Sequence, residues 1–95
     1  MDKESSSPTG HLPAQFKNFT DDASRIVRLP VKLSKKIALA DWALTLFEFE
    51  RVYSESQVNE IIGEFVEDFA LIRRMLVESG QLERDRYGYE YRRVA

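Results

Sequence analysis

The 95-residue sequence contains no cysteine, and this absence excludes several kinds of chemistry at once. Without thiolates the chain cannot form disulfides, a cysteine-type zinc site, an iron–sulfur cluster or a thiol nucleophile. Histidine occurs once, at His11, so a base that would activate a serine or threonine is scarce. The four glycines are scattered and form no phosphate-binding loop. We therefore expect a protein that is not an enzyme and that uses no cofactor or metal.

Long apolar runs are also lacking. No stretch of 18 apolar residues is present, and the first 13 residues have no apolar core of the kind found in a signal peptide. Three consecutive serines, two prolines and a glycine bury little apolar surface, so residues 1–15 are predicted to be a disordered tail. With 43% hydrophobic residues in the chain, residues 16–95 are expected to form one domain. These features favour a cytoplasmic protein without a membrane association.

Positive charge is not in excess. The formal net charge is −2, so the chain does not coat nucleic acid by bulk positive charge. Residues 1–36 carry seven basic and four acidic side chains, residues 37–68 one basic and eight acidic, and residues 69–95 six basic and four acidic. An acidic middle therefore separates two mildly basic ends.

Apolar periodicity and cap residues predict three helices. Ser34 is suited to begin the first, and Ser54 with Gln57 forms a capping box that begins the second. Asp68 is suited to begin the third, and Gly80 fits the left-handed position that ends it. The predicted helices span residues 35–49, 54–66 and 69–79.

Strand signals flank the helices. Residues 25–29 are a short β-prone run that ends at Pro30, and we expect a strand there. Residues 82–94 alternate with a period of two around Tyr87 and Gly88, which predicts a β-hairpin with Gly88 at positive φ. Three short helices followed by a hairpin are typical of a winged helix-turn-helix. The expected fold is therefore α+β: a three-helix, winged-helix-like domain with a C-terminal β-hairpin and a short N-terminal strand.

A set of spaced motif residues runs from the first predicted helix to the hairpin. The pattern is F-x5-Y-[ST]-E-x-x-V-N, then D-x4-R-R-x-L-V, G-x-L-x-R and G-x-x-Y. The matching residues are Phe47, Tyr53, Ser54, Glu55, Val58, Asn59, Asp68, Arg73, Arg74, Leu76, Val77, Gly80, Leu82, Arg84, Gly88 and Tyr91. Together with residues 25–32, they resemble the bacterial family catalogued as domain of unknown function 2087, over roughly residues 24–92.

The resemblance implies a winged-helix-like domain that occurs in small stand-alone proteins or beside helix-turn-helix transcriptional regulators. The family has no assigned chemistry that would transfer to residues of this chain. One departure is Gln57, where the family more usually has an acidic or basic residue. A glutamine keeps the capping box intact.

Arginines are concentrated on the third helix and the hairpin. The candidate nucleic-acid-binding residues are Arg73, Arg74, Arg84, Arg86, Arg92 and Arg93. The planar guanidinium suits phosphate and guanine edges, and three tyrosines of the hairpin alternate with these arginines. The alternative is that nearby Glu78, Glu83, Asp85 and Glu90 pair with the arginines on an ordinary solvated surface.

Two further groups of residues have alternative interpretations. Tyr53, Glu55, Asn59 and Asp68 form a candidate structural polar cluster, in which Glu55 or Asn59 faces Arg73 or Arg74 and leaves the other arginine free. The apolar stripe of Leu39, Trp42, Leu46 and Phe49 either packs in the core or forms a partner or homodimer surface.

The sequence thus predicts a small non-enzymatic module that binds nucleic acid or acts in transcription regulation. The alternative is a protein–protein interaction module that uses the same fold without nucleic-acid contact.

Overall fold

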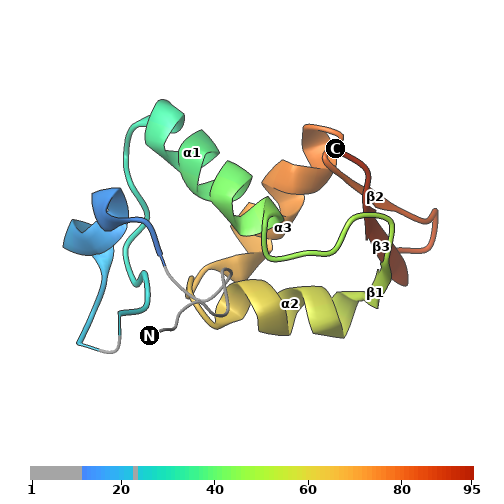
Figure 1. The fold of residues 1–95 in the computed structure, drawn as a ribbon, viewed down its shortest axis with the longest axis horizontal. Helices are drawn as coiled ribbons and strands as arrows, with labels where there is room; N and C mark the ends of the chain where they lie inside the picture. The colour runs from blue at the N-terminus through green and yellow to red at the C-terminus, as the bar shows by residue number, and fades with distance from the viewer. Residues whose placement is uncertain (1–11, 23) are drawn as a thin grey trace, which may run out of the picture.

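The computed structural model describes residues 12–22 and 24–95, which form four helices and a three-stranded antiparallel sheet (Figure 1). The elements in chain order are the 3-10 helix η1 (Ala14–Phe19), α1 (Leu33–Leu44), β1 (Val52–Ser54), α2 (Glu55–Gly63), α3 (Phe69–Glu78), β2 (Leu82–Arg84) and β3 (Glu90–Arg93). The predicted α+β class is confirmed at this level. Most of the predicted tail, residues 1–11, lies outside the described residues, and Ala14 and Gln15 belong to η1.

The prediction of a strand at residues 25–29 is wrong. Only Ile26 makes β-type contacts there, as isolated bridges to Thr20 and Val66. Its N–H donates to the Phe65 carbonyl at 2.7 Å, and its carbonyl accepts from the Glu67 N–H at 2.8 Å. One residue is therefore clamped between two loops, and the short run has no extended neighbour with which to form a longer ladder.

The third strand of the sheet is β1, which the sequence analysis missed. Strand β3 lies in the middle, with β1 on one side and β2 on the other, both antiparallel to it. Tyr91 of β3 is opposite Tyr53 of β1 and Arg84 of β2. At three residues, β1 is too short for a period of two to be recognised, since it passes directly into α2.

Helix α1 begins at Leu33, with Lys32 as the preceding residue and no side-chain cap, so the prediction that Ser34 begins this helix is wrong. The helix ends at Leu44, earlier than the predicted end at Phe49. The N–H groups of Thr45, Leu46 and Phe47 each donate to the carbonyl three residues before, at 2.9–3.1 Å. These shorter-range bonds tighten the last turn. The chain then reverses at Glu50, whose φ of 68° is left-handed, and enters β1.

The cap residues of the second and third helices are confirmed. The Ser54 hydroxyl accepts from the Gln57 N–H at 3.1 Å, and the Gln57 side chain accepts from the Ser54 N–H at 2.9 Å. The Asp68 carboxylate accepts from the Leu71 N–H at 3.3 Å. Gly80 follows α3 with a φ of 81°. These contacts are local, which is why the sequence indicated them.

The hairpin has a longer turn than expected. Its strands end at Arg84 and begin again at Glu90. The Asp85 carboxylate accepts from the N–H groups of Tyr89 and Glu90 at 2.7 and 3.3 Å. Gly88, with a φ of 75°, supplies the predicted left-handed position. The hairpin is therefore confirmed, and Asp85 organises its turn.

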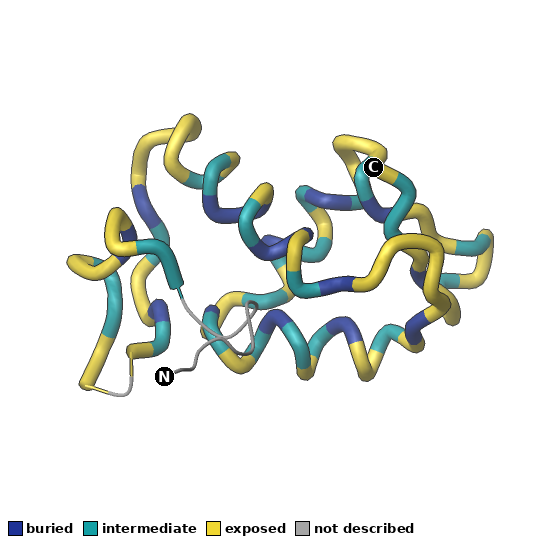
Figure 2. Tube along the Cα trace, viewed as in Figure 1, coloured by how far each residue is buried: buried dark blue, intermediate teal, exposed yellow. Residues whose placement is uncertain are grey.

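The core lies where the three helices and the sheet meet, as the dark segments of Figure 2 show. Each of the three α-helices contributes residues that are 0% exposed: Leu39 and Ala43 of α1, Val58 and Ile62 of α2, and Ile72 and Leu76 of α3. The sheet adds Leu82 and Tyr91, each 1% exposed. In the described part of the chain, no helix is both long and apolar enough to cross a bilayer.

The capping box provides a test of the local structure. Ser54→Ala removes the acceptor at the start of α2 and is expected to lower the free energy of unfolding by about 1 kcal/mol, measured by urea denaturation. The matched control is Ser56→Ala, because Ser56 is exposed within α2 and makes no capping bond. An equal loss in both variants would contradict the capping role.

Candidate functional site

The six arginines on the last helix and the hairpin divide into two groups. Arg73, Arg92 and Arg93 contact acceptors within the chain. Arg74, Arg84 and Arg86 are exposed, and in the described residues no carboxylate oxygen lies within 4.0 Å of their side-chain nitrogens. The second group therefore has guanidinium surface available to a ligand.

Arg73 joins α3 to α2. Its Nη1 donates to the Asn59 side-chain oxygen and lies 4.0 Å from a Glu55 carboxylate oxygen. The side chain of Arg73 is 22% exposed, compared with 44% for Glu55. The expected contact between these two helices is present, and Arg73 is the arginine that makes it. The pair is half-buried, and the amide of Asn59 is the closer partner.

Arg92 and Arg93 form hydrogen bonds and ion pairs within the chain. Arg92 donates to Glu83 at 2.6 Å and lies 3.7 Å from Glu50, and both acidic partners raise its pKa. Arg93 donates to the carbonyls of Leu44 and Phe47 at 3.4 and 3.2 Å. Arg93 therefore occupies acceptors where α1 ends, and neither residue presents a free guanidinium.

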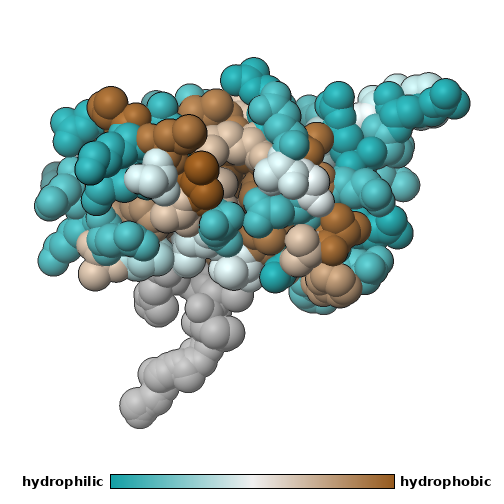
Figure 3. Space-filling model, turned by 90° about the horizontal axis from the view of Figure 1, so that it is seen from above, coloured by the Kyte–Doolittle hydropathy of each residue, from teal (hydrophilic) through white to brown (hydrophobic). Residues whose placement is uncertain are grey.

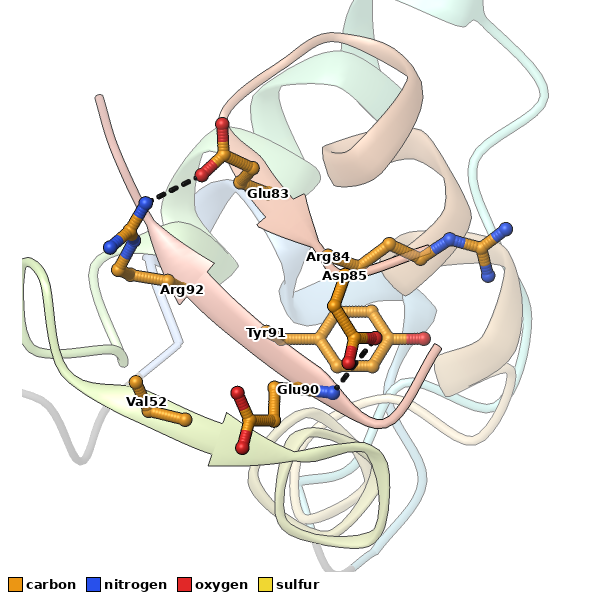
Figure 4. Close-up of a pocket in the computed structure, with 7 residues that line it drawn as sticks. All are labelled: Val52, Glu83, Arg84, Asp85, Glu90, Tyr91 and Arg92. Atoms are coloured by element: carbon orange, nitrogen blue, oxygen red, sulfur yellow. Dashed lines mark hydrogen bonds and ion pairs between the residues drawn. The ribbon is translucent and has the colours of Figure 1, made fainter. Parts of the chain in front are cut away.

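Side chains of the hairpin extend in opposite directions, as the residues labelled in Figure 4 show. Arg92 pairs with Glu83 on one side, whereas the Arg84 side chain extends past the Tyr91 hydroxyl in the other direction. The hollow drawn there, of about 230 Å³, is lined by Val52, Glu83, Arg84, Asp85, Glu90, Tyr91 and Arg92. Three carboxylates against two guanidiniums make this hollow unfavourable for phosphate.

The opposite side of the hairpin faces α3 across a cavity of about 210 Å³. Its lining residues are Arg73, Arg74, Val77, Glu78, Arg84 and Tyr91. Three guanidiniums and one carboxylate thus gather between α3 and β2. We call this the arginine cavity.

Tyr91 is buried beside this cavity and is bonded to α2. Its hydroxyl donates to the Glu55 carboxylate at 2.7 Å. Burial is the main cause that raises the pKa of Tyr91 above its usual value of 10.0, and the bond to Glu55 adds to it, while Arg84 lowers it. The hydroxyl therefore remains protonated at neutral pH. Sequence reasoning placed Tyr91 beside the arginines without its bond to Glu55, because the sheet register decides which tyrosine turns inward.

The other two tyrosines of the hairpin lie at its tip. Tyr87 and Tyr89 are 68% and 71% exposed, and their rings stack with centroids 5.9 Å apart. The Arg86 guanidinium carbon lies 5.7 Å from the centre of the Tyr87 ring. A flat aromatic pair with an adjacent cation suits stacking against a base or lying along a backbone.

The predicted polar cluster is not one cluster. Glu55 and Asn59 meet at Arg73, but Asp68 caps α3. Tyr53 is buried, and its hydroxyl accepts from the Glu48 N–H at 2.8 Å, which holds the loop before β1.

The predicted apolar stripe is divided between core and surface. Leu39 is fully buried, and Trp42 and Leu46 are half-buried against the core. The Trp42 ring meets Phe65 edge to face, with centroids 5.2 Å apart. Phe49 lies beyond the end of α1 and is 57% exposed. Because α1 ends at Leu44, the four residues do not share one helix face.

The comparison with protein families assigns the chain. The model described as "Uncharacterized protein conserved in bacteria (DUF2087)" matches residues 25–93. The chain belongs to this family. The match includes α1 through β3 and all six arginines, and it confirms the resemblance seen in the sequence. No curated protein and no solved structure matches the chain.

Tyr91→Phe tests the bond that joins the sheet to α2. Loss of a hydrogen bond to a charged group is expected to lower the free energy of unfolding by about 1.5–3 kcal/mol at pH 7, measured by urea denaturation. Since the folded-state pKa is raised above 10.0, the unfolded state loses its proton first as the pH rises. The Tyr91 contribution is therefore full below pH 10 and falls above it, so the difference between wild type and variant shrinks there.

The control is Tyr87→Phe, which removes an exposed hydroxyl and is expected to leave stability unchanged at every pH. A Tyr91→Phe difference that stays constant above pH 10 would show that the hydroxyl is not the stabilising group.

Proposed function

We propose that this protein is a small non-enzymatic module of the winged-helix type that binds nucleic acid, in a regulatory role in the bacterial cytoplasm. The observation that carries the proposal is the group of Arg74, Arg84 and Arg86. These exposed guanidiniums lie on α3 and the hairpin without acidic partners in the described residues.

The order of the elements supports this type of fold. The helices α2 and α3 are followed by the hairpin of β2 and β3, and β1 joins this hairpin to make the sheet order β1-β3-β2. In helix-turn-helix proteins the second helix of the pair enters the major groove. Here that helix is α3, and the adjacent ribbon carries Arg84 and Arg86.

The distribution of charge indicates how the protein would be oriented. The exposed acidic residues Glu60 and Glu64 lie on or directly after α2, and this side would be repelled by phosphate. Contact is therefore expected through α3 and the tip of the hairpin. Helix α3, of sequence FALIRRMLVE, has no Ser, Thr, Asn or Gln to read base edges. We infer binding that follows the phosphate backbone more than the base sequence.

A protein-interaction module is the second candidate, and one observation favours it. Exposed apolar side chains lie within residues 27–37, on and before the start of α1, and Figure 3 shows brown areas on the surface of the molecule. They are Val27, Val31, Leu33 and Ile37, with Val31 92% exposed. This surface differs from the predicted stripe, whose Trp42 packs on Phe65. It would dock a protein partner or a second copy of the chain.

Fluorescence anisotropy with a short labelled DNA duplex at low salt tests the first proposal. The variant Arg74→Glu/Arg84→Glu/Arg86→Glu is expected to lose binding, because three phosphate contacts become repulsive. For wild type, three such contacts predict a slope of roughly −2.7 in log affinity against log salt, or about a 40-fold loss between 50 and 200 mM salt.

The matched control is Lys17→Glu/Lys32→Glu/Lys35→Glu. It changes the net charge equally on exposed residues of η1 and the start of α1, at the end of the molecule opposite the hairpin (Figure 1). This control is expected to keep most of the affinity. An equal loss of DNA affinity in both variants would mean that binding depends on net charge alone. If the wild-type protein does not bind DNA, the proposal of nucleic-acid binding is wrong and the protein-interaction module remains as the candidate function.

A further inference from the structure

We propose that the arginine cavity between α3 and β2 is a binding site for one terminal phosphate group, a phosphate monoester. The inference shares Arg74 and Arg84 with the proposed nucleic-acid surface and to that extent rests on the proposed function.

Guanidiniums reach the cavity from two different elements. Arg73 and Arg74 come from α3, and Arg84 comes from β2. Arginine presents several N–H donors in a plane and often binds phosphate through two parallel bonds. A terminal phosphate has three free oxygens, whereas a phosphodiester within a strand has two. Three guanidiniums that line one cavity therefore match the terminal group better.

Arg73 and Tyr91, which both line the cavity, are each held by a hydrogen bond to α2 before any ligand binds. Glu55, on α2, accepts from the Tyr91 hydroxyl at 2.7 Å and lies 4.0 Å from Arg73. Asn59, one turn further along α2, accepts a hydrogen bond from Arg73. Because these side chains are already ordered, less conformational entropy is lost on binding. Arg84 of β2 is opposite Tyr91 of β3 and lowers the pKa of its hydroxyl, and both residues line the cavity.

The charges favour an anion. Three guanidiniums and one carboxylate, Glu78, line the cavity. Glu78 follows Arg74 by one helical turn, but no arginine nitrogen lies within 4.0 Å of its oxygens. Glu55 contacts Arg73 and Tyr91 from α2, so its negative charge offsets one guanidinium, and the charge around the cavity remains positive. A phosphate monoester carries a charge of about −1.5 to −2 at pH 7, which complements the lining.

The volume of the arginine cavity limits the size of the chemical group that can enter it. A volume of about 210 Å³ is below the roughly 300–1,000 Å³ of pockets that enclose a drug-sized ligand. The phosphate would enter, and the rest of the molecule would stay outside. Two sources share this chemistry: the phosphorylated end of a nucleic-acid strand and a free phosphorylated small molecule.

The site is tested first with inorganic phosphate, by following the arginine side-chain N–H resonances in an NMR titration. We expect saturable shifts of the Arg73, Arg74 and Arg84 signals. Arg84→Gln is expected to weaken phosphate binding about ten-fold or more, since it removes a charged hydrogen-bond partner. The control, Lys35→Gln, removes one exposed positive charge at the start of α1, does not line the cavity and is expected to leave phosphate binding unchanged. Arg73 is left intact because it also joins the helices.

A second measurement distinguishes the sources. Oligonucleotides of one sequence, with and without a 5′-phosphate, are compared by anisotropy. Tighter binding of the phosphorylated strand that is abolished by Arg84→Gln and kept by Lys35→Gln identifies a nucleic-acid end as the ligand. Saturable binding of inorganic phosphate with no binding of either strand or of duplex supports the cavity with a small phosphorylated ligand and refutes the proposed function.

Another result would contradict the phosphate monoester site but not the proposed nucleic-acid binding. Duplex that binds through Arg74, Arg84 and Arg86, together with phosphate shifts that do not saturate and no preference for the phosphorylated strand, would leave the proposed function standing. The arginine cavity would then have no role as a phosphate monoester site.

Discussion

The hydrogen bond from the Tyr91 hydroxyl to the Glu55 carboxylate is the contact on which the rest of the arrangement depends. Tyr91 lies in the middle strand and is 1% exposed, so its hydroxyl needs a partner inside the protein. Glu55 supplies that partner from α2 and also faces Arg73 on α3. One carboxylate thereby links the sheet to both helices. The arginine cavity lies in the space that this linkage defines.

Residue type alone did not decide the role of the arginines. Arg92 and Arg93 are engaged by acceptors on β2 and at the end of α1, and Arg73 is engaged by α2. Arg74 and Arg84 meet at one cavity without such partners in the described residues. Carboxylates surround this small cationic region, and charges in solution are screened beyond about 8 Å at physiological salt. Recognition would therefore depend on direct contact, with little steering from a distance.

The parts of the fold that local chemistry specifies were predictable. The Ser54 capping box, the Asp68 cap and the left-handed glycines Gly80 and Gly88 all involve residues within a few positions of one another. The errors concern strands and the ends of α1. Residues 25–29 have β propensity but gain only the bridges of Ile26, and β1 acquires its strand character from β3, almost forty residues later. Likewise, α1 ends at Leu44, although the apolar pattern continues to Phe49.

The sequence by itself determined the α+β class, the positions of two helix starts and the hairpin, the family, and the concentration of arginines near the C-terminus. Only the tertiary structure decided which arginines are occupied and which are available. It also selected Tyr91, out of three neighbouring tyrosines, as the buried one. The physical reason is that hydrogen bonding and burial join residues far apart in the chain. Tyr91 and Glu55 are 36 positions apart, and no local pattern encodes their meeting.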